Sequence, residues 1–348
     1  MTSRRVAPAV VLRSASALEP FARTPVGSSV LQAGIHSEAF LRRRAEHVQR
    51  LVTITTGLSD AAGRRRMAEL ERRRQLAPGR YANGSKLPDV HWHGSDHVDG
   101  SRPVVVLVNG WTASGLVWPS SVVDRLAVAH HVIRVDNRGV GFSRTAPAPF
   151  TVEQMADDVI DVLDAVGAGA ATVVGLSMGG MIAQEVAIRH PARVSRLLLL
   201  GTRPPSPAAF MPAQHVVDAV MSVPRPDETF REFVLRAWSS IAGAGFLERD
   251  RAGAEELVDR IAERVTPRAG VLSQARAIAA WHGAQRLGSI TAPTAVVHGR
   301  DDPLVPVGNG MRIAQLIDGA QYVELAGIGH LVPFEAPDTV VAAITGSG

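Results

Sequence analysis

The chain has 348 residues, 46% of them hydrophobic and 20% charged, and it contains no cysteine. This length and composition support a large folded core, and they exclude disulfide bonds and thiolate chemistry. No apolar run reaches the length of a membrane-spanning helix. The formal net charge of +4 hides an asymmetry, because residues 1–80 carry 15 arginines and 6 acidic residues, whereas residues 81–348 carry 22 basic and 27 acidic residues.

Residues 1–87 are predicted to form a basic extension outside the main domain. Apolar residues recur at helical spacing over residues 38–52, and a second helix is expected over residues 60–76, each with arginine clusters. Such clusters can bind nucleic acid or an anionic membrane, but no nucleic-acid motif accompanies them. A secretory signal or transit peptide is the weaker interpretation, since the apolar run after Arg5 is short and Arg13 interrupts it. We expect two solvated amphipathic helices that dock on the main domain of the same chain, and we expect the protein to be cytoplasmic.

His91 and His93 lie two residues apart in a stretch with strand character, so their side chains are expected on one face, like a pair of metal ligands. Three more potential ligands follow, namely Asp96, His97 and Asp99. No spacing typical of a zinc site accompanies them, however, and residues 94–100 read as a turn. We therefore interpret this stretch as a surface hairpin without a metal.

Continuous apolar runs alternate with helical patterns from residue 103 onward. Such runs are typical of strands covered on both faces, as in a parallel sheet. The run over residues 103–109 is of this kind, and further strands are predicted over residues 131–136, 171–175, 194–201, 294–299 and 321–325. The alternation predicts an α/β fold with a doubly wound, mostly parallel sheet.

The helical pattern over residues 151–166 predicts which of its side chains face the core and which face solvent. The side chains expected to face inward are Met155, Val159, Ile160, Leu163 and Val166. The side chains expected to face outward are Asp157, Asp158, Asp161 and Asp164.

The alternation stops between residues 203 and 290, where several helices follow a proline-rich linker. A helical lid inserted into the core fits this pattern, because a site for apolar substrates needs a cover that excludes water. The core is then formed by residues 88–202 and 291–348. The aromatic side chains of the insertion can line the site or form the core of the lid itself, and they are Phe210, Phe230, Phe233, Trp238, Phe246 and Trp281.

The turn within residues 172–183 carries the pattern Gly175-x-Ser177-x-Gly179, between an apolar strand and a helix. A serine can attack a carbonyl only if its Oγ projects clear of the backbone. Gly175 and Gly179 have no Cβ, so the two arms of the turn can pass close together. The start of the helix adds free N–H groups and a positive dipole end where an oxyanion would form. The pattern predicts a nucleophilic serine, although a glycine-rich chain can also produce it by chance.

Four further motifs surround the serine turn. They are Asn109-Gly110-Trp111, Asp136-x-Arg138-Gly139-x-Gly141-x-Ser143, Gly299-Arg300-Asp301-Asp302-Pro303-Leu304-Val305-Pro306 and Gly327-x-Gly329-His330. In this order, the five motifs resemble the α/β-hydrolase superfamily, in its lid-bearing serine esterase, lactonase and perhydrolase-like branch. The resemblance covers residues 88–346 and leaves out the extension.

The resemblance implies a catalytic triad of Ser177, Asp302 and His330. Ser177 would be the nucleophile, His330 the base that takes its proton, and Asp302 the carboxylate that orients the imidazole. The oxyanion hole would be formed by the backbone N–H groups of Trp111 and Met178.

Two positions in these motifs need comment. Asn109 stands where the family most often has histidine, so the hydrogen bonds of its loop must be arranged differently. The resemblance implies that the acid is Asp302, the aspartate directly before the stretch Pro303-Leu304-Val305-Pro306. Pro303 supports this choice because it holds the preceding residue extended, while Asp301 is expected to turn toward solvent or cap the local turn. Residues 136–143 are interpreted as a structural turn.

The predicted function is a cofactor-free serine hydrolase that cleaves an ester, a lactone or a thioester through an acyl-enzyme at Ser177. No metal is expected, and the expected partner is a small apolar acyl or lactone substrate and not a nucleic acid. Perhydrolysis and C–C bond cleavage remain alternatives on the same triad, as does a non-catalytic binding protein on this fold. The sequence indicates neither the substrate nor the oligomeric state.

Overall fold

The computed structural model describes residues 90–346, apart from 96, 144–148, 221, 223, 226 and 264–267. The predicted extension 1–87 and its two helices lie outside these residues. None of the described helices is both long and apolar enough to cross a membrane.

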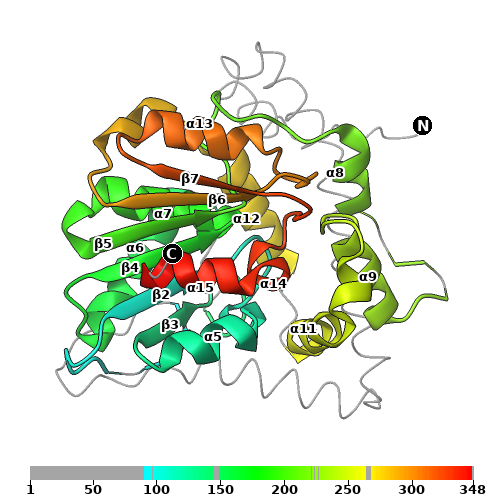
Figure 1. The fold of residues 1–348 in the computed structure, drawn as a ribbon, viewed down its shortest axis with the longest axis horizontal. Coiled ribbons are helices and arrows are strands. Elements are labelled where there is room, and N and C mark those ends of the chain that lie inside the picture. Colours follow the sequence, from blue (N-terminus) through cyan, green and yellow to red (C-terminus); the bar gives the residue numbers. More distant parts are fainter. Residues whose placement is uncertain are drawn as a thin grey trace, which may run out of the picture. The chain divides into compact units, whose positions relative to one another are not determined.

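A seven-stranded sheet organises the described chain, in the order β1-β3-β2-β4-β5-β6-β7 (Figure 1). The strands are β1 (Trp92–Gly94), β2 (Val104–Val108), β3 (His131–Val135), β4 (Ala171–Leu176), β5 (Val194–Leu200), β6 (Thr294–Gly299) and β7 (Gln321–Leu325). Every neighbouring pair is parallel except β1 with β3. The predicted α/β fold with a mostly parallel sheet is confirmed.

The pairing of β1 differs from the prediction. A surface hairpin over this stretch was expected, but β1 pairs with β3, with Trp92 opposite Val135. The loop after β1 folds around His131 of β3, whose Nε2 lies 3.0 Å from an Asp99 carboxylate oxygen and whose Nδ1 lies 3.2 Å from Ser95 Oγ. The hairpin does not form because both edges of β2 are already occupied by β3 and β4.

Helices cover both faces of the sheet (Figure 1). One face is covered by α6 (Val152–Val166), α7 (Met178–Arg189) and α13 (Gly308–Leu316), and the other by α5 (Ser120–Ala127), α14 (Val332–Glu335) and α15 (Pro337–Thr345). Successive residues of a strand point to opposite faces. Leu197 and Leu199 of β5 therefore join one apolar core, while Leu198 and Leu200 join the other. Burial on both faces explains the unbroken apolar runs of the sequence.

Helix α6 begins with a capping box, in which Thr151 and Gln154 exchange side-chain and backbone hydrogen bonds, and it ends at Gly167 in the left-handed region. All five side chains predicted to face inward are buried. The outward prediction is wrong for Asp158, which is buried and accepts two hydrogen bonds from the guanidinium of Arg138. The pairing with Arg138 compensates a charge that helical periodicity alone assigns to solvent.

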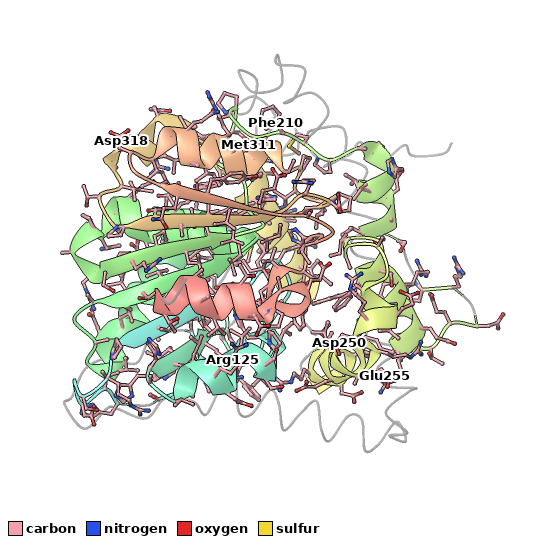
Figure 2. All side chains as sticks on the ribbon, viewed as in Figure 1. Arg125, Phe210, Asp250, Glu255, Met311 and Asp318 are labelled. Carbon is pink, nitrogen blue, oxygen red and sulfur yellow. The ribbon has the colours of Figure 1, made fainter. Side chains whose placement is uncertain are left out.

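The segment between β5 and β6 is largely helical, and α8, α9 and α11 stand to one side of the sheet (Figure 1). Its helices are α8 (Gln214–Val220), α9 (Phe230–Ser239), α10 (Phe246–Arg249), α11 (Arg251–Glu263), α12 (Arg268–Ala280) and the 3-10 helix η3 (Ala284–Ser289). Phe230 and Phe233 form a small core of their own with Val258. Trp281 joins the main core, whereas Phe210 is 53% exposed (Figure 2).

Replacing Arg138 with leucine is expected to lower the free energy of unfolding by about 3–5 kcal/mol, because the buried Asp158 carboxylate loses both hydrogen bonds and the charge of the Arg138 guanidinium. Urea unfolding measures the loss. The double variant Arg138→Leu/Asp158→Leu is expected to recover much of it.

The matched control is Arg125→Leu, since Arg125 lies on the surface of α5 (Figure 2) and pairs with Asp338, whose side chain is 91% exposed. An exposed pair of this kind contributes little. Equal losses from Arg138→Leu and Arg125→Leu would contradict the assignment of a buried, compensating ion pair.

Candidate active site

Ser177 lies at the turn between β4 and α7, with φ 55° and ψ −120°. A residue other than glycine rarely adopts a positive φ, and such strained residues cluster at functional sites. The turn is held from β5 on both sides of the serine. The Ser177 N–H donates to Leu200 O at 3.0 Å, and the Ser177 carbonyl accepts from Thr202 Oγ1 at 2.7 Å.

The two glycines of the serine turn are required by packing. A Cβ on Gly175 would collide with the backbone of Gly179, and a Cβ on Gly179 would collide with the carbonyl oxygen of Val108 in β2. Only glycine lets the start of α7 approach the sheet this closely. Gly110, in the loop after β2, also approaches the serine, since a Cβ there would lie 3.3 Å from Ser177 Cβ.

His330 and Asp302 form a buried pair. His330 Nδ1 lies 2.8 Å from Asp302 Oδ2, and both residues are 5% exposed. The other carboxylate oxygen, Oδ1, accepts the N–H groups of Leu304 at 2.9 Å and Val305 at 2.8 Å. Asp301, by contrast, is exposed.

Burial alone would raise the pKa of Asp302, but the charge and hydrogen bond of His330, together with those of His298, lower it below its usual value. The carboxylate is therefore ionised at neutral pH. An ionised Asp302 accepts the Nδ1–H of His330, which leaves Nε2 of that imidazole as the basic nitrogen.

Gly201, directly after β5, connects the serine turn with the His330–Asp302 pair. A Cβ on Gly201 would lie 3.4 Å from Asp302 Oδ2 and 3.5 Å from His330 Nδ1. The residue before it, Leu200, accepts the backbone hydrogen bond of Ser177. The three predicted residues thus gather around the end of β5. Within the described residues, Ser177 Oγ makes no hydrogen bond to His330, as is common in sites without substrate.

Glu335 is a residue of the site that the sequence analysis missed. It lies in the short helix after His330, and its carboxylate accepts the N–H groups of Gly243, Gly329 and Leu331 at 2.8–3.1 Å. The N–H of His330 itself donates to Ile241 O at 2.7 Å. The loop of residues 329–331, called the histidine loop below, is therefore attached to the helical segment between β5 and β6. An acidic residue five positions after the histidine is too common a signal to reveal this.

His298 of β6 is the second residue that the sequence analysis missed. It is fully buried, and its Nε2 lies 2.8 Å from Val305 O and 3.5 Å from Asp302 Oδ2. Asp302 is thus flanked by two imidazoles. His298 and Asp302 are four residues apart, but this spacing alone does not predict their contact. The contact depends on the turn after β6, which the sequence does not define.

The loop after β2 contains the predicted oxyanion hole and is closed by the Asn109 side chain. Its Oδ1 accepts the Gly110 N–H at 2.9 Å, and its Nδ2 donates to Ser114 O at 3.1 Å. This is the arrangement by which asparagine replaces the usual histidine. Among the described residues, the N–H groups of Trp111 and Met178 have no hydrogen-bond partner.

The turn after β3 supports this loop. Asp136 is fully buried, and its carboxylate accepts the N–H of Gly115 at 2.7 Å and that of Phe142 at 2.9 Å. Ser143 Oγ donates to the Asp136 carbonyl and accepts the N–H of His91. The structure thus gives residues 136–143 the supporting role expected of them. His91, His93 and Asp136 are also the described residues with the geometry of a metal-ligand group.

The parallel sheet, the serine turn and the His330–Asp302 pair are the features of an α/β hydrolase. A family described as the alpha/beta hydrolase fold matches residues 103–337. The chain therefore belongs to this family of enzymes.

The chain is similar to an esterase, a putative carbamate hydrolase, a putative non-heme bromoperoxidase and a lactonase. It is 29% identical over 274 residues to rhodomycin D methylesterase DauP of Streptomyces sp. (strain C5), covering 69% of this chain and 89% of the relative. It is 31% identical over 248 residues to the putative carbamate hydrolase RutD of Variovorax paradoxus (strain S110), covering 69% and 88%. The solved enol-lactonase of Burkholderia xenovorans LB400 matches with a TM-score of 0.61 and 26% identity, covering 74% of this chain and 95% of that one.

Asn109→Asp is expected to open the loop after β2 at neutral pH. The substitution removes the donor to Ser114 O and places a carboxylate oxygen against that carbonyl, at a cost of about 1–3 kcal/mol. The free energy of unfolding should recover as the pH falls and the new carboxyl takes up a proton. A loss that does not change with pH would contradict the hydrogen-bond assignment.

Proposed function

We propose that the chain is a serine hydrolase that cleaves an ester, a lactone or a thioester through an acyl-enzyme at Ser177. The observation that carries the proposal is the positive φ of Ser177, at a turn that β5 holds beside the His330–Asp302 pair. A strained serine at this position has no packing role that glycine would not fill with less strain.

In the first step of the proposed mechanism, Ser177 Oγ attacks the substrate carbonyl and His330 Nε2 takes its proton. Asp302 stabilises the imidazolium that forms. The carbonyl oxygen becomes an oxyanion, and the unpaired N–H groups of Trp111 and Met178 are the donors for it. Their fixed orientation stabilises charge that develops only in the transition state.

In the second step, the carbon–oxygen or carbon–sulfur bond to the leaving group breaks and His330 delivers its proton to that group. The acyl group stays on Ser177. Water then attacks the acyl carbon, with His330 as base, and releases the acid and the free serine. All electron pairs and protons of this cycle are supplied by the chain, the substrate and water.

The segment 203–290 is proposed to act as a lid over a core of residues 88–202 and 291–348, with residues 1–87 as a separate extension. The contacts of segment 203–290 with the histidine loop and the helix after it support the role of a lid. Trp238 of α9 packs edge to face on Phe334, with ring centroids 5.5 Å apart, and Ile241 accepts the His330 N–H. An apolar cover of this kind suits an apolar acyl or lactone substrate. The names of a methylesterase and an enol-lactonase among the similar proteins point the same way.

Ser177→Ala is expected to abolish turnover of a panel of chromogenic esters and lactones of increasing chain length, together with labelling by a fluorophosphonate. Removal of a triad nucleophile costs on the order of 10⁶-fold in turnover. Peptide mass mapping locates the label in the wild type.

Ser114→Ala is the matched control, because Ser114 is also buried beside the site and its Oγ has no hydrogen-bond partner among the described residues. It should keep both labelling and turnover. A folded protein that is never labelled would instead support a binding protein, and a wild type that brominates with peroxide but does not hydrolyse esters would support a perhydrolase.

Asp302→Asn is expected to lower turnover on the order of 10⁴-fold, because an amide cannot hold the working tautomer of His330. Asp301→Asn changes an exposed neighbour and should leave turnover within a few fold. The measurement is kcat of both variants on one ester. A large loss at Asp301 with near-normal turnover at Asp302→Asn would reverse the assignment.

A further inference from the structure

A second group of functional side chains lies at the edge of the sheet, outside the proposed triad. His91, His93 and Asp136 each present one ligand atom, and these atoms all lie within 4.8 Å of one another. His93 lies in β1 and His91 directly precedes that strand, two residues earlier, so in extended backbone the two side chains share a face. Asp136 directly follows β3, the strand that pairs with β1. The pairing of two strands distant in sequence therefore assembles the group.

Buried carboxylates of this protein have two kinds of partner. Asp158 and Glu185 are each paired with an arginine, Arg138 and Arg286 respectively. The Asp136 carboxylate is fully buried and, like that of Asp302, has no arginine partner among the described residues. Its hydrogen-bond partners there are two backbone N–H groups and the His93 imidazole, whose Nε2 lies 3.1 Å away.

The guanidinium of Arg134 does not pair with this carboxylate. Arg134 is close enough to interact electrostatically with Asp136, but among the described residues it makes no hydrogen bond to that carboxylate. A buried carboxylate that lies next to two imidazoles and has no arginine partner among the described residues is an environment that favours a bound cation.

The ligands are held in place by the fold. Backbone N–H groups of Gly115 and Phe142 fix the two oxygens of Asp136, which is the outer hydrogen bonding expected around a metal ligand. The backbone of His91 is held on both sides, because its N–H donates to Ser143 Oγ at 2.8 Å and its carbonyl accepts the Asp136 N–H at 2.9 Å.

The donor set selects the class of ion. Two imidazole nitrogens and one carboxylate oxygen suit zinc and similar borderline divalent ions, whereas calcium and magnesium prefer oxygen ligands alone. Tetrahedral zinc with bonds near 2.1 Å places its ligand atoms about 3.4 Å apart. The present spread of up to 4.8 Å requires a contraction of up to about 1.4 Å, within reach of side-chain rotation.

We propose that His91, His93 and Asp136 form a binding site for a divalent transition-metal ion of the zinc type, with solvent as the fourth ligand. The His93 side chain is 11% exposed, so the site is open to solvent on that side. Bound there, the ion fastens the edge strand β1 to the turn after β3. It takes no part in the triad chemistry.

The ion would also reinforce the loop that carries the proposed oxyanion hole. Asp136 accepts the Gly115 N–H, and the preceding carbonyl, of Ser114, accepts the Asn109 side chain that closes the loop. Two hydrogen bonds therefore separate the metal ligand Asp136 from Asn109. The expected role is stabilisation of the native state.

The test uses the full chain after dialysis against a chelator, with zinc chloride as the probe. Isothermal titration calorimetry is expected to show one ion per chain, and Tm is expected to rise with zinc concentration because the ion binds only the native state. Substitution by cobalt(II) should give the intense visible bands of a tetrahedral nitrogen–oxygen site. No measurement of hydrolase activity enters, so this test is independent of the proposed function.

His91→Ala is the diagnostic variant, because it removes one ligand and leaves the His93–Asp136 hydrogen bond intact. Zinc affinity should fall at least about 10-fold and the cobalt bands should vanish. His91→Gln provides a second variant of similar size, and circular dichroism of both without metal confirms folding. His97→Ala, an exposed histidine outside the group, is the matched control and should bind as the wild type does. Absent zinc binding by the wild type, or binding unchanged in both His91 variants, would overturn the proposal.

Discussion

The arrangement of the site depends on one close approach, that of Gly179 at the start of α7 to the carbonyl of Val108 in β2. Because no Cβ fits there, the helix can begin immediately above the sheet and its first N–H groups open toward the strand ends. The central position of β4, between β2 and β5, then brings three strand ends together. The loop after β2, the serine turn and Gly201 after β5 converge for this reason.

Two buried carboxylates near the ends of strands have similar surroundings but different proposed roles. Asp302 and Asp136 are each accompanied by two histidines and two backbone N–H donors. At Asp302 one imidazole, that of His330, lies beside Gly201, which connects it to the serine turn. At Asp136 one imidazole belongs to the edge strand β1 and the other to the residue directly before it, and the two rings pack edge to face with centroids 4.8 Å apart. The two carboxylates therefore differ in the neighbours of their histidines, which are the serine turn at Asp302 and the sheet edge at Asp136.

The strands and the inward face of α6 could be predicted because they depend on local periodicity. The candidate triad could be predicted as a set, since each residue stands in a short motif, although its catalytic role stays a prediction. Asp158 was assigned wrongly because its partner, Arg138, is 20 residues away and periodicity carries no information on it. The pairing of β1, the contact of His298 and the role of Glu335 depend on tertiary neighbours in the same way. Residues 1–87 lie outside the structural test.

The attachment of the histidine loop has a mechanical consequence. Glu335 joins Gly243 to Gly329, and Ile241 accepts the N–H of His330, so residues 241–243 and the base share one hydrogen-bonded unit. Any swing of this part of the helical segment must either break those bonds or carry His330 with it. Under the mechanism proposed above, a movement of residues 241–243 that admits a ligand would therefore also take the proposed base, His330, out of alignment.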